Sequence, residues 1–351
     1  MGEPSVALTG AGEQPIWHMT SAERICRMAA QAGLRFADGD ADIKVDAGFV
    51  FDPLWLDHVA QDPGLTVTCD GHAVLAHHGE LSHALASEGA TLFNPALRKR
   101  EQPFMMVLTP ASRDAAERAS YDAAYKGVTD FATKYLWHGL AFYLVRIAAR
   151  IGVSPNNITA IGAVLCVLAT TFFYRGDYWP GMAAGFIFMV LDTVDGKLAR
   201  CTLTSSKIGD FFDHGIDLVH PPFWWWAWGM GLMAYGTPLA EAMWTFAFAA
   251  ILASYVLQRV IEGIFIAAFR IHIHVWRKLD SDFRLITARR NPNMLLLIPF
   301  LLLQRPDWGF LALAIWGVAS LLFHLVRLIQ AFVYRVRGQA IESWLGQASS
   351  A

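Results

Sequence analysis

Six predominantly apolar stretches follow one another from residue 158 onward. They run over about residues 158–173, 178–195, 209–235, 239–269, 294–303 and 309–333. A helix crosses a bilayer with about 20 apolar residues, so the first stretch is somewhat short and the fifth is long enough only with its flanks. The pattern predicts a mainly α protein, a polytopic membrane bundle of about six transmembrane helices.

The first hundred residues show a different pattern, with short apolar runs between helical stretches. The runs lie at residues 6–8, 43–45, 65–67 and 73–75. Thr20, followed three positions later by Glu23, has the form of a capping box that opens a helix to about residue 32. This alternation favours a partly parallel sheet. We therefore expect a small α/β cytoplasmic domain over residues 1–108, and a juxtamembrane helix plus transmembrane domain over residues 109–351.

A further helix is predicted between these regions, beginning at the N-cap and first-turn proline Thr109-Pro110. An apolar stripe and accompanying basic residues follow at helical spacing: Ala124, Val128, Phe131 and Tyr135, with Arg113, Arg118, Lys126 and Lys134. This pattern indicates a helix on the membrane surface, with its basic side chains toward anionic headgroups. The alternative is a helix packed against the N-terminal domain.

Composition supports a membrane protein, because 55% of the 351 residues are hydrophobic. The formal net charge of −2 gives no reason to expect a nucleic-acid partner. The four cysteines are scattered and form neither a disulfide framework nor a zinc-ligand pattern. The first twelve residues lack a basic start followed by an apolar core, so no cleavable signal peptide is expected.

Basic residues predict the orientation of the spans. One set of connections holds Lys197, Arg200, Lys207, Arg270, Arg277, Lys278, Arg284, Arg289, Arg290, Arg335 and Arg337, and the opposite set holds Arg175 and Arg305. The richer side is cytoplasmic by the positive-inside rule. We expect an integral protein of a bacterial inner membrane, with both termini in the cytoplasm.

Carboxylates gather where the second and third apolar stretches meet the polar connection between them. Asp192 and Asp195 are three residues apart, and Asp213 and Asp217 are four apart, so each pair shares a helix face. An Asp at the bilayer centre costs about 2.5–3.5 kcal/mol on insertion scales, and like charges repel. Hard divalent cations with oxygen ligands are the natural compensation. Two such ions can clamp a transferring phosphate group.

The full pattern resembles the signature of the CDP-alcohol phosphotransferases, with all eight fixed positions filled. These positions are Asp192, Asp195, Gly196, Ala199, Arg200, Gly209, Asp213 and Asp217. The segment from Ser154 to Thr159 resembles the entry of that family's first span. The resemblance covers roughly residues 110–338. It implies a membrane enzyme that moves a substituted phosphate from a CDP-alcohol to a hydroxyl group and releases CMP, in phospholipid or related phosphodiester biosynthesis.

The resemblance also implies roles for these residues. Asp192, Asp195 and Asp213 would bind two divalent ions, Mg²⁺ or Mn²⁺, and Asp217 would be both a ligand and the base that accepts the acceptor's proton. The nucleotide-binding residues would be Gly196, Ala199, Arg200 and Gly209. Close helix packing is the alternative role for the glycines.

Asp210, His214 and His220 lie near the motif but outside the signature. A direct role in the site is the alternative for these three residues, and His214 is expected to orient a carboxylate or to face solvent. Trp224, Trp225, Trp226 and Trp228 are expected to form a packing or interfacial cluster. Arg259 and Glu262 stand at i, i+3 spacing in the fourth stretch, which favours an internal ion pair. The cytoplasmic arginines could bind an anionic headgroup or an acceptor phosphate, and ordinary orientation signals explain them equally well.

The N-terminal region faintly resembles the opening of sugar-phosphate nucleotidyltransferases. The resemblance rests on residues 8–12 and 15–20, a Gly-rich loop after a first strand. Glu13 and Gln14 stand where such loops carry a basic residue, so we expect a degenerate, non-catalytic domain. The spacing of His58, His72, His77, His78 and His83 fits no standard metal site.

Two donors and two other functions stay open. The donor is either CDP-diacylglycerol with a polar acceptor, or a soluble CDP-alcohol with a lipid or polyol acceptor, which the N-terminal resemblance slightly favours. Intramembrane carboxylates also occur in cation transporters. A membrane anchor for the N-terminal domain would leave the filled motif unexplained. Relatives of the family commonly form homodimers, which this sequence does not reveal.

Overall fold

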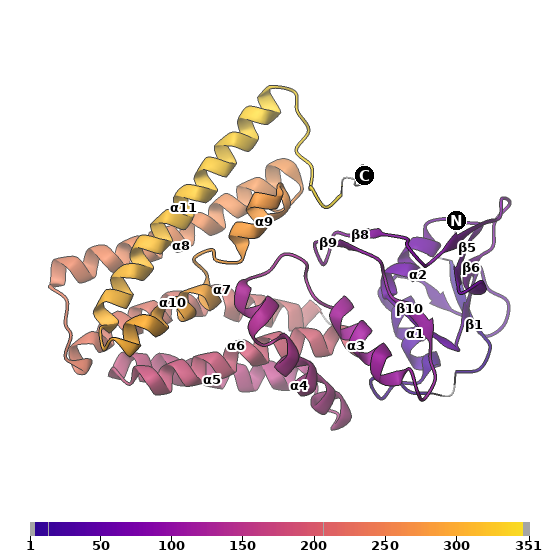
Figure 1. Cartoon of the computed structure of the whole chain (residues 1–351), viewed down its shortest axis with the longest axis horizontal. Coiled ribbons are helices and arrows are strands. Elements are labelled where there is room, and N and C mark those ends of the chain that lie inside the picture. The colour runs from indigo at the N-terminus through magenta and orange to yellow at the C-terminus, as the bar shows by residue number, and fades with distance from the viewer. Residues whose placement is uncertain (1–3, 13, 206, 347–351) are drawn as a thin grey trace. The chain divides into compact units, whose positions relative to one another are not determined.

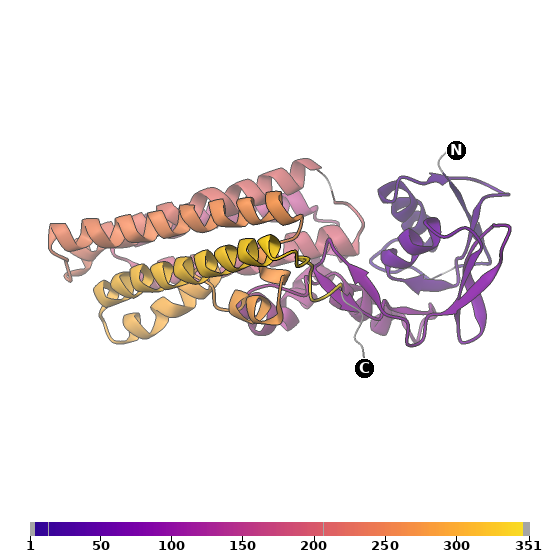
Figure 2. The same ribbon diagram turned by 90° about the horizontal axis from the view of Figure 1, so that it is seen from above.

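The computed structural model describes residues 4–12, 14–205 and 207–346, with the side chains of residues 207–214 excepted. The chain folds as two compact units. The N-terminal unit comprises residues 1–127, 142–155 and 195–205, and the helical unit comprises residues 128–141, 156–194 and 206–351. Figures 1 and 2 show the strands in the first part of the chain and the long helices in the rest.

A six-stranded mixed sheet forms the centre of the N-terminal unit, in the order β2-β1-β3-β6-β5-β7. The strands are β1 (Ser5–Thr9), β2 (Arg35–Phe36), β3 (Ile43–Asp46), β5 (Leu65–Cys69), β6 (His72–His77) and β7 (His83–Ala86). β1 pairs in parallel with β2 and β3, and β6 is antiparallel to β3 and β5. The four strands expected from the apolar runs and the partly parallel sheet are therefore confirmed.

Two helices pack on this sheet through apolar side chains. α1 (Ser21–Gln31) begins as predicted, because the Thr20 hydroxyl accepts a hydrogen bond from the Glu23 amide at 3.2 Å. α2 (Pro53–Ala60) begins with Asp52 as its N-cap. Ile25 of α1 and Trp55 of α2 are buried in the same apolar core as the strands. Short pairs complete the unit: β4 (Phe49–Phe51) with β10 (Met105–Val107), and β8 (Leu92–Asn94) with β9 (Lys99–Glu101).

The single helix predicted from Thr109 is wrong. Thr109 instead forms a turn in which its amide donates to the Ser112 hydroxyl at 2.9 Å, so α3 (Arg113–Ala123) begins later. Ala124 and Val128 are buried, while Phe131 and Tyr135 are exposed, so the proposed stripe does not form one face. A π-helical turn (Ala132–Leu136) and α4 (His138–Arg150) follow. The exposed apolar side chains continue along α4, at Leu140, Tyr143 and Ile147.

All six predicted apolar stretches form helices. They are α5 (Pro155–Arg175), α6 (Tyr178–Cys201), α7 (Lys207–Tyr235), α8 (Glu241–Phe269), α10 (Arg290–Leu302) and α11 (Pro306–Val336). Among the described residues, α5, α8 and α11 are long and apolar enough to cross a membrane. The number of six spans therefore stays a prediction. A 3₁₀ turn (Ile273–Val275) and α9 (Lys278–Arg284) connect α8 to α10.

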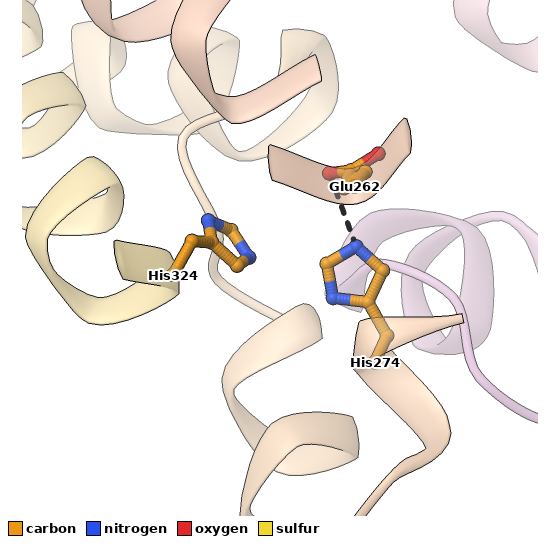
Figure 3. A group of neighbouring side chains, drawn as sticks. All are labelled: Glu262, His274 and His324. Carbon is orange, nitrogen blue, oxygen red and sulfur yellow. Dashed lines mark hydrogen bonds and ion pairs between the residues drawn. The ribbon is translucent and has the colours of Figure 1, made fainter. Parts of the chain in front are cut away.

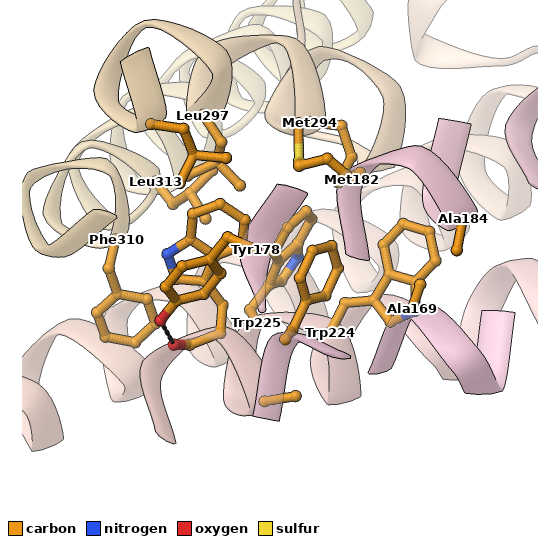
Figure 4. Close-up of a cluster of buried hydrophobic side chains, with 14 of the residues drawn as sticks. Ala169, Tyr178, Met182, Ala184, Trp224, Trp225, Met294, Leu297, Phe310 and Leu313 are labelled. Carbon is orange, nitrogen blue, oxygen red and sulfur yellow. Dashed lines mark hydrogen bonds between the residues drawn. The ribbon is translucent and has the colours of Figure 1, made fainter. Parts of the chain in front are cut away.

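Aromatic side chains fill the core of the helical unit. Trp224, Trp225 and Trp228 of α7 are buried against α6, α10 and α11, and Figure 4 shows part of this cluster. The indole N–H of Trp224 donates to the Cys166 carbonyl at 3.1 Å, and the Tyr178 hydroxyl donates to the Trp228 carbonyl at 2.7 Å. The predicted packing role of these tryptophans is confirmed, with polar atoms that have partners.

Candidate active site

Asp192 and Asp217 lie on different helices and contact the same cation. Asp192 is in α6 and Asp217 is in α7. Nη2 of Arg290, the first residue of α10, lies 2.6 Å from Asp192 Oδ2. Nη1 of the same guanidinium lies 2.5 Å from Asp217 Oδ1. Two of the four predicted metal-ligand carboxylates therefore converge, and one arginine holds them together.

The guanidinium of Arg290 is fixed from several sides. Its Nε donates to the Asn291 side-chain oxygen at 3.0 Å, and it lies 4.9 Å from the centre of the Phe188 ring. The Asn291 amide nitrogen in turn lies 3.1 Å from both carboxylate oxygens of Asp130. Only 10% of the Arg290 side chain is exposed, against 43% for Asp217, so the cluster opens to solvent on the Asp217 side.

The end of α6 carries the other residues of the motif's first half, and their contacts lie in the N-terminal unit. Asp195 is buried, and one of its oxygens accepts a hydrogen bond from the Gly196 amide at 2.6 Å. Arg200 Nε and Lys197 Nζ both donate to the carbonyl of Ala124, at 3.0 and 2.8 Å. These two basic residues thus stabilise the C-terminal end of α3.

The guanidinium of Arg200 lies close to Gly196. A Cβ at residue 196 would lie 3.1 Å from Nη2 of Arg200, which is closer than ordinary van der Waals contact. Ala199 is half-buried in the same helix. The guanidinium of Arg200 therefore occupies the place that a larger side chain at residue 196 would take.

Of the remaining predicted residues, Gly209, Asp210, Asp213 and His214 lie in the segment whose side chains the structure does not describe. His220 is buried, and its Nδ1–H donates to the Ile216 carbonyl at 2.6 Å. Its ring packs against Phe188 and Trp224, which is a structural role.

Arg290 and Asn291 are site residues that the sequence reasoning missed. Arg290 had been counted among the basic residues that set orientation. The available signal was its place immediately before an apolar stretch, where a side chain at the start of a helix can reach inward. The predicted ion pair of Arg259 with Glu262 is present at 3.2 Å.

The carboxylates fit divalent cations such as Mg²⁺ or Mn²⁺. Their ligand atoms are hard oxygens, and carboxylates from two helices already converge on one positive charge. Asp192 is 17% exposed, so its charge requires compensation in this position. Arg290 supplies that compensation.

Comparisons with known proteins agree with this geometry. Residues 152–326 match the family model described as CDP-alcohol phosphatidyltransferase. Cholinephosphotransferase 1 of Danio rerio is 33% identical over 118 residues, which cover 30% of this chain and 30% of that protein. The human cholinephosphotransferase 1 is 27% identical over 150 residues, covering 40% of this chain and 34% of that protein.

An archaeal protein is also similar. The archaetidylinositol phosphate synthase of Pyrococcus horikoshii is 42% identical over 72 residues, 20% of this chain and 37% of that protein. The chain spans about a third of the length of the cholinephosphotransferases it matches. The family match begins at residue 152, so the nucleotidyltransferase likeness of residues 1–108 stays a prediction. With the filled Asp motif and three candidate spans, residues 152–326 belong to the CDP-alcohol phosphatidyltransferase family and make this an integral membrane protein.

Proposed function

We propose that the protein is a metal-dependent membrane transferase of phospholipid or related phosphodiester biosynthesis. It moves a substituted phosphate from a CDP-alcohol to an acceptor hydroxyl and releases CMP. The observation that carries this proposal is the convergence of Asp192 and Asp217 on the guanidinium of Arg290, at 2.6 and 2.5 Å. In the family, the residues at these signature positions bind the metal ions that hold the pyrophosphate of the donor.

Four carboxylates would hold two Mg²⁺ or Mn²⁺ ions: Asp192, Asp195, Asp213 and Asp217. When bound, these ions neutralise the donor phosphates and the departing CMP. These ions and Arg290 would compete for Asp192 and Asp217, because a guanidinium and a metal ion would repel one another at this distance.

Asp217 has the position expected of the general base. It is the more exposed member of the described pair, so an acceptor can approach it. The acceptor oxygen attacks the phosphorus that bears the alcohol, and the bond to the bridging pyrophosphate oxygen breaks. The hydroxyl proton passes to Asp217, and CMP leaves with the bonding electron pair.

The small and basic residues of the motif would hold the nucleotide. Gly196, Ala199 and Gly209 would allow close approach, and Arg200 would donate hydrogen bonds to phosphate or cytosine. The close approach of the Arg200 guanidinium to Gly196 supports this assignment, because a larger side chain at residue 196 would displace it.

The relatives favour a soluble CDP-alcohol as the donor. Two of them are named as cholinephosphotransferases, which fits transfer of a small phosphoalcohol to a lipid or polyol acceptor. The alternative donor is CDP-diacylglycerol or a similar lipid, because another relative is named an archaetidylinositol phosphate synthase. We place both termini and the active site on the cytoplasmic side of a bacterial inner membrane, as the basic residues predict. A homodimer is compatible with this arrangement.

The test is a product analysis with purified protein in detergent or vesicles. Radiolabelled CDP-choline and CDP-diacylglycerol are each supplied with Mn²⁺ and a panel of lipid and polyol acceptors. Label from CDP-choline in a lipid product supports the soluble donor, whereas label from CDP-diacylglycerol alone supports the lipid donor. Transport of Mn²⁺ into vesicles without CMP formation from any donor would refute the proposed function.

A further inference from the structure

A second group of metal-ligand side chains lies in the helical unit, and none of its members is a motif aspartate. Glu262 comes from α8, His274 from the 3₁₀ turn that follows α8, and His324 from α11. One ligand atom of each lies within 4.8 Å of the others. Figure 3 shows the two imidazoles and the carboxylate turned toward a common centre. Segments distant in sequence thus bring two nitrogen ligands and one oxygen ligand together.

His324 is the side chain that the fold leaves unexplained. The residue is only 1% exposed, and neither ring nitrogen has a hydrogen-bond partner among the described residues. Its ring centre lies 5.2 Å from that of His274. Leaving a buried polar group unsatisfied costs about 1–3 kcal/mol. A ligand that engages a nitrogen of His324 would remove this cost.

Arg289 occupies the side of the cluster between Glu262 and His274. Its Nη2 contacts Glu262 Oε1 and lies 3.2 Å from His274 Nε2. The same His274 Nε2 also lies 3.2 Å from Glu262 Oε1, so this nitrogen, the carboxylate and the guanidinium meet at one point. The carboxylate and this nitrogen therefore already face a positive charge, as they would face a metal ion.

We propose that Glu262, His274 and His324 form a binding site for a first-row transition-metal dication such as Zn²⁺. Two imidazoles and one carboxylate are a known zinc ligand set, whereas Mg²⁺ prefers oxygen ligands. Zinc–ligand bonds are about 2.0–2.2 Å long, so in a tetrahedral site the ligand atoms lie roughly 3.4 Å from one another. Small rotations of the three side chains would bring their ligand atoms to this separation. Arg289 is 22% exposed and leaves the cluster when the ion binds. The ion ties α8 to α11 and keeps a fourth position open.

The test uses the full chain, purified without a histidine tag, treated with chelator and then titrated with Co²⁺ and Zn²⁺. We expect one Co²⁺ per chain with the absorption of a four-coordinate ion, displaced by Zn²⁺, in the presence of excess Mg²⁺. His324→Ala should weaken Zn²⁺ binding by at least about 100-fold, the upper end of what loss of an outer-sphere partner costs. Arg289→Ala should strengthen it, because a competing cation is removed.

Two control variants distinguish this site from the other candidate metal sites of the chain. Asp192→Asn should retain Zn²⁺, which distinguishes the site from the proposed catalytic ions. Cys69→Ser should also retain it, since Cys69, Asp70 and Glu88 form another group with ligand spacing. Absence of Co²⁺ binding, Zn²⁺ lost in Cys69→Ser, or unchanged binding in His324→Ala would each overturn the proposal. If His324→Ala does not fold, weaker or unchanged Zn²⁺ binding by Arg289→Ala overturns it equally.

Discussion

Nη2 of Arg290 lies 2.6 Å from Asp192 Oδ2, which joins the start of α10 to the motif carboxylate of α6. The same guanidinium reaches Asp217 of α7 at 2.5 Å. Three helices of the helical unit therefore meet at one charge-neutralising group. This arginine offsets the repulsion that two unpaired carboxylates would cause.

Arg290→Gln tests whether the arginine and the metal ions compete for these carboxylates. Breaking a buried ion pair costs about 3–5 kcal/mol, so the variant should unfold at a lower temperature than wild type in EDTA. Mn²⁺ should restore much of this loss and should bind more tightly than to wild type. Thermal unfolding and Mn²⁺ titration by electron paramagnetic resonance measure both effects.

Arg305→Gln is the matched control, because Arg305 also pairs closely with one aspartate, Asp307, at the other end of α10. This variant should leave Mn²⁺ affinity unchanged. Equal Mn²⁺ affinity in wild type and Arg290→Gln would contradict the competition.

Gly196→Ala tests the space beside Arg200. The added methyl would lie 3.1 Å from Arg200 Nη2 and should displace the guanidinium. We expect CMP and CDP-alcohol to bind about 10-fold more weakly, which corresponds to about 1.4 kcal/mol. Isothermal titration with CMP provides the measurement. Gly263→Ala is the control, because nothing lies within 4 Å of its added Cβ. If both variants bind CMP like wild type, Gly196 is not a nucleotide-site residue.

Cys26 tests the predicted orientation of the protein. It is the exposed one of the four free cysteines, whereas Cys69, Cys166 and Cys201 are buried. Burial also raises the pKa of Cys201 to about 12, which keeps that thiol protonated and unreactive at pH 8. A membrane-impermeant maleimide should therefore label one thiol per chain in inverted membrane vesicles, and none in intact spheroplasts. Labelling in spheroplasts that Cys26→Ser abolishes would place the N-terminal unit outside.

Arg24 of α1 is a buried cation with little compensation. It is 4% exposed, and its Nη2 donates to the Phe51 carbonyl at 3.1 Å, while Nε and Nη1 have no partner among the described residues. Burial lowers its pKa from 12.5 to about 10, so the charged form destabilises the fold. Arg24→Met should therefore stabilise the N-terminal unit by about 1–4 kcal/mol.

Hydrogen exchange of the α1 peptides at pH 7.5 measures this gain. The gain should shrink as the pH rises through about 10, because the folded wild type then loses the Arg24 proton. Arg27→Met is the contrasting variant and should give no such gain, since Arg27 is partly exposed, pairs with Glu23 and donates to the Thr202 carbonyl at 2.6 Å. Faster exchange in Arg24→Met than in wild type would show that the charge stabilises the unit.

Local patterns predicted the elements of the fold. The apolar runs gave four strands and six helices, and Thr20 capped α1 as expected. These features depend on residues close in sequence. The helix predicted from Thr109 failed because the bonds between Thr109 and Ser112 compete with helix formation, and the apolar spacing does not reveal this.

The site was predicted only where the family signature reaches. The signature named Asp192 and Asp217, which the fold brings together. Arg290 lies 98 positions from Asp192, and no local spacing links them. The same applies to His324, whose neighbours Glu262 and His274 come from other segments. Such partners are set by tertiary packing, so a single sequence carries no direct signal for them.

The most direct measurement is CMP release by the purified protein with Mn²⁺ and CDP-alcohol donors, comparing wild type with Asp217→Asn. The account predicts metal-dependent CMP release that requires an acceptor. It also predicts a loss of at least about 100-fold in Asp217→Asn, because removal of a general base costs about 10²–10⁴-fold in rate. Acceptor-dependent CMP release that is undiminished in Asp217→Asn would contradict the central claim.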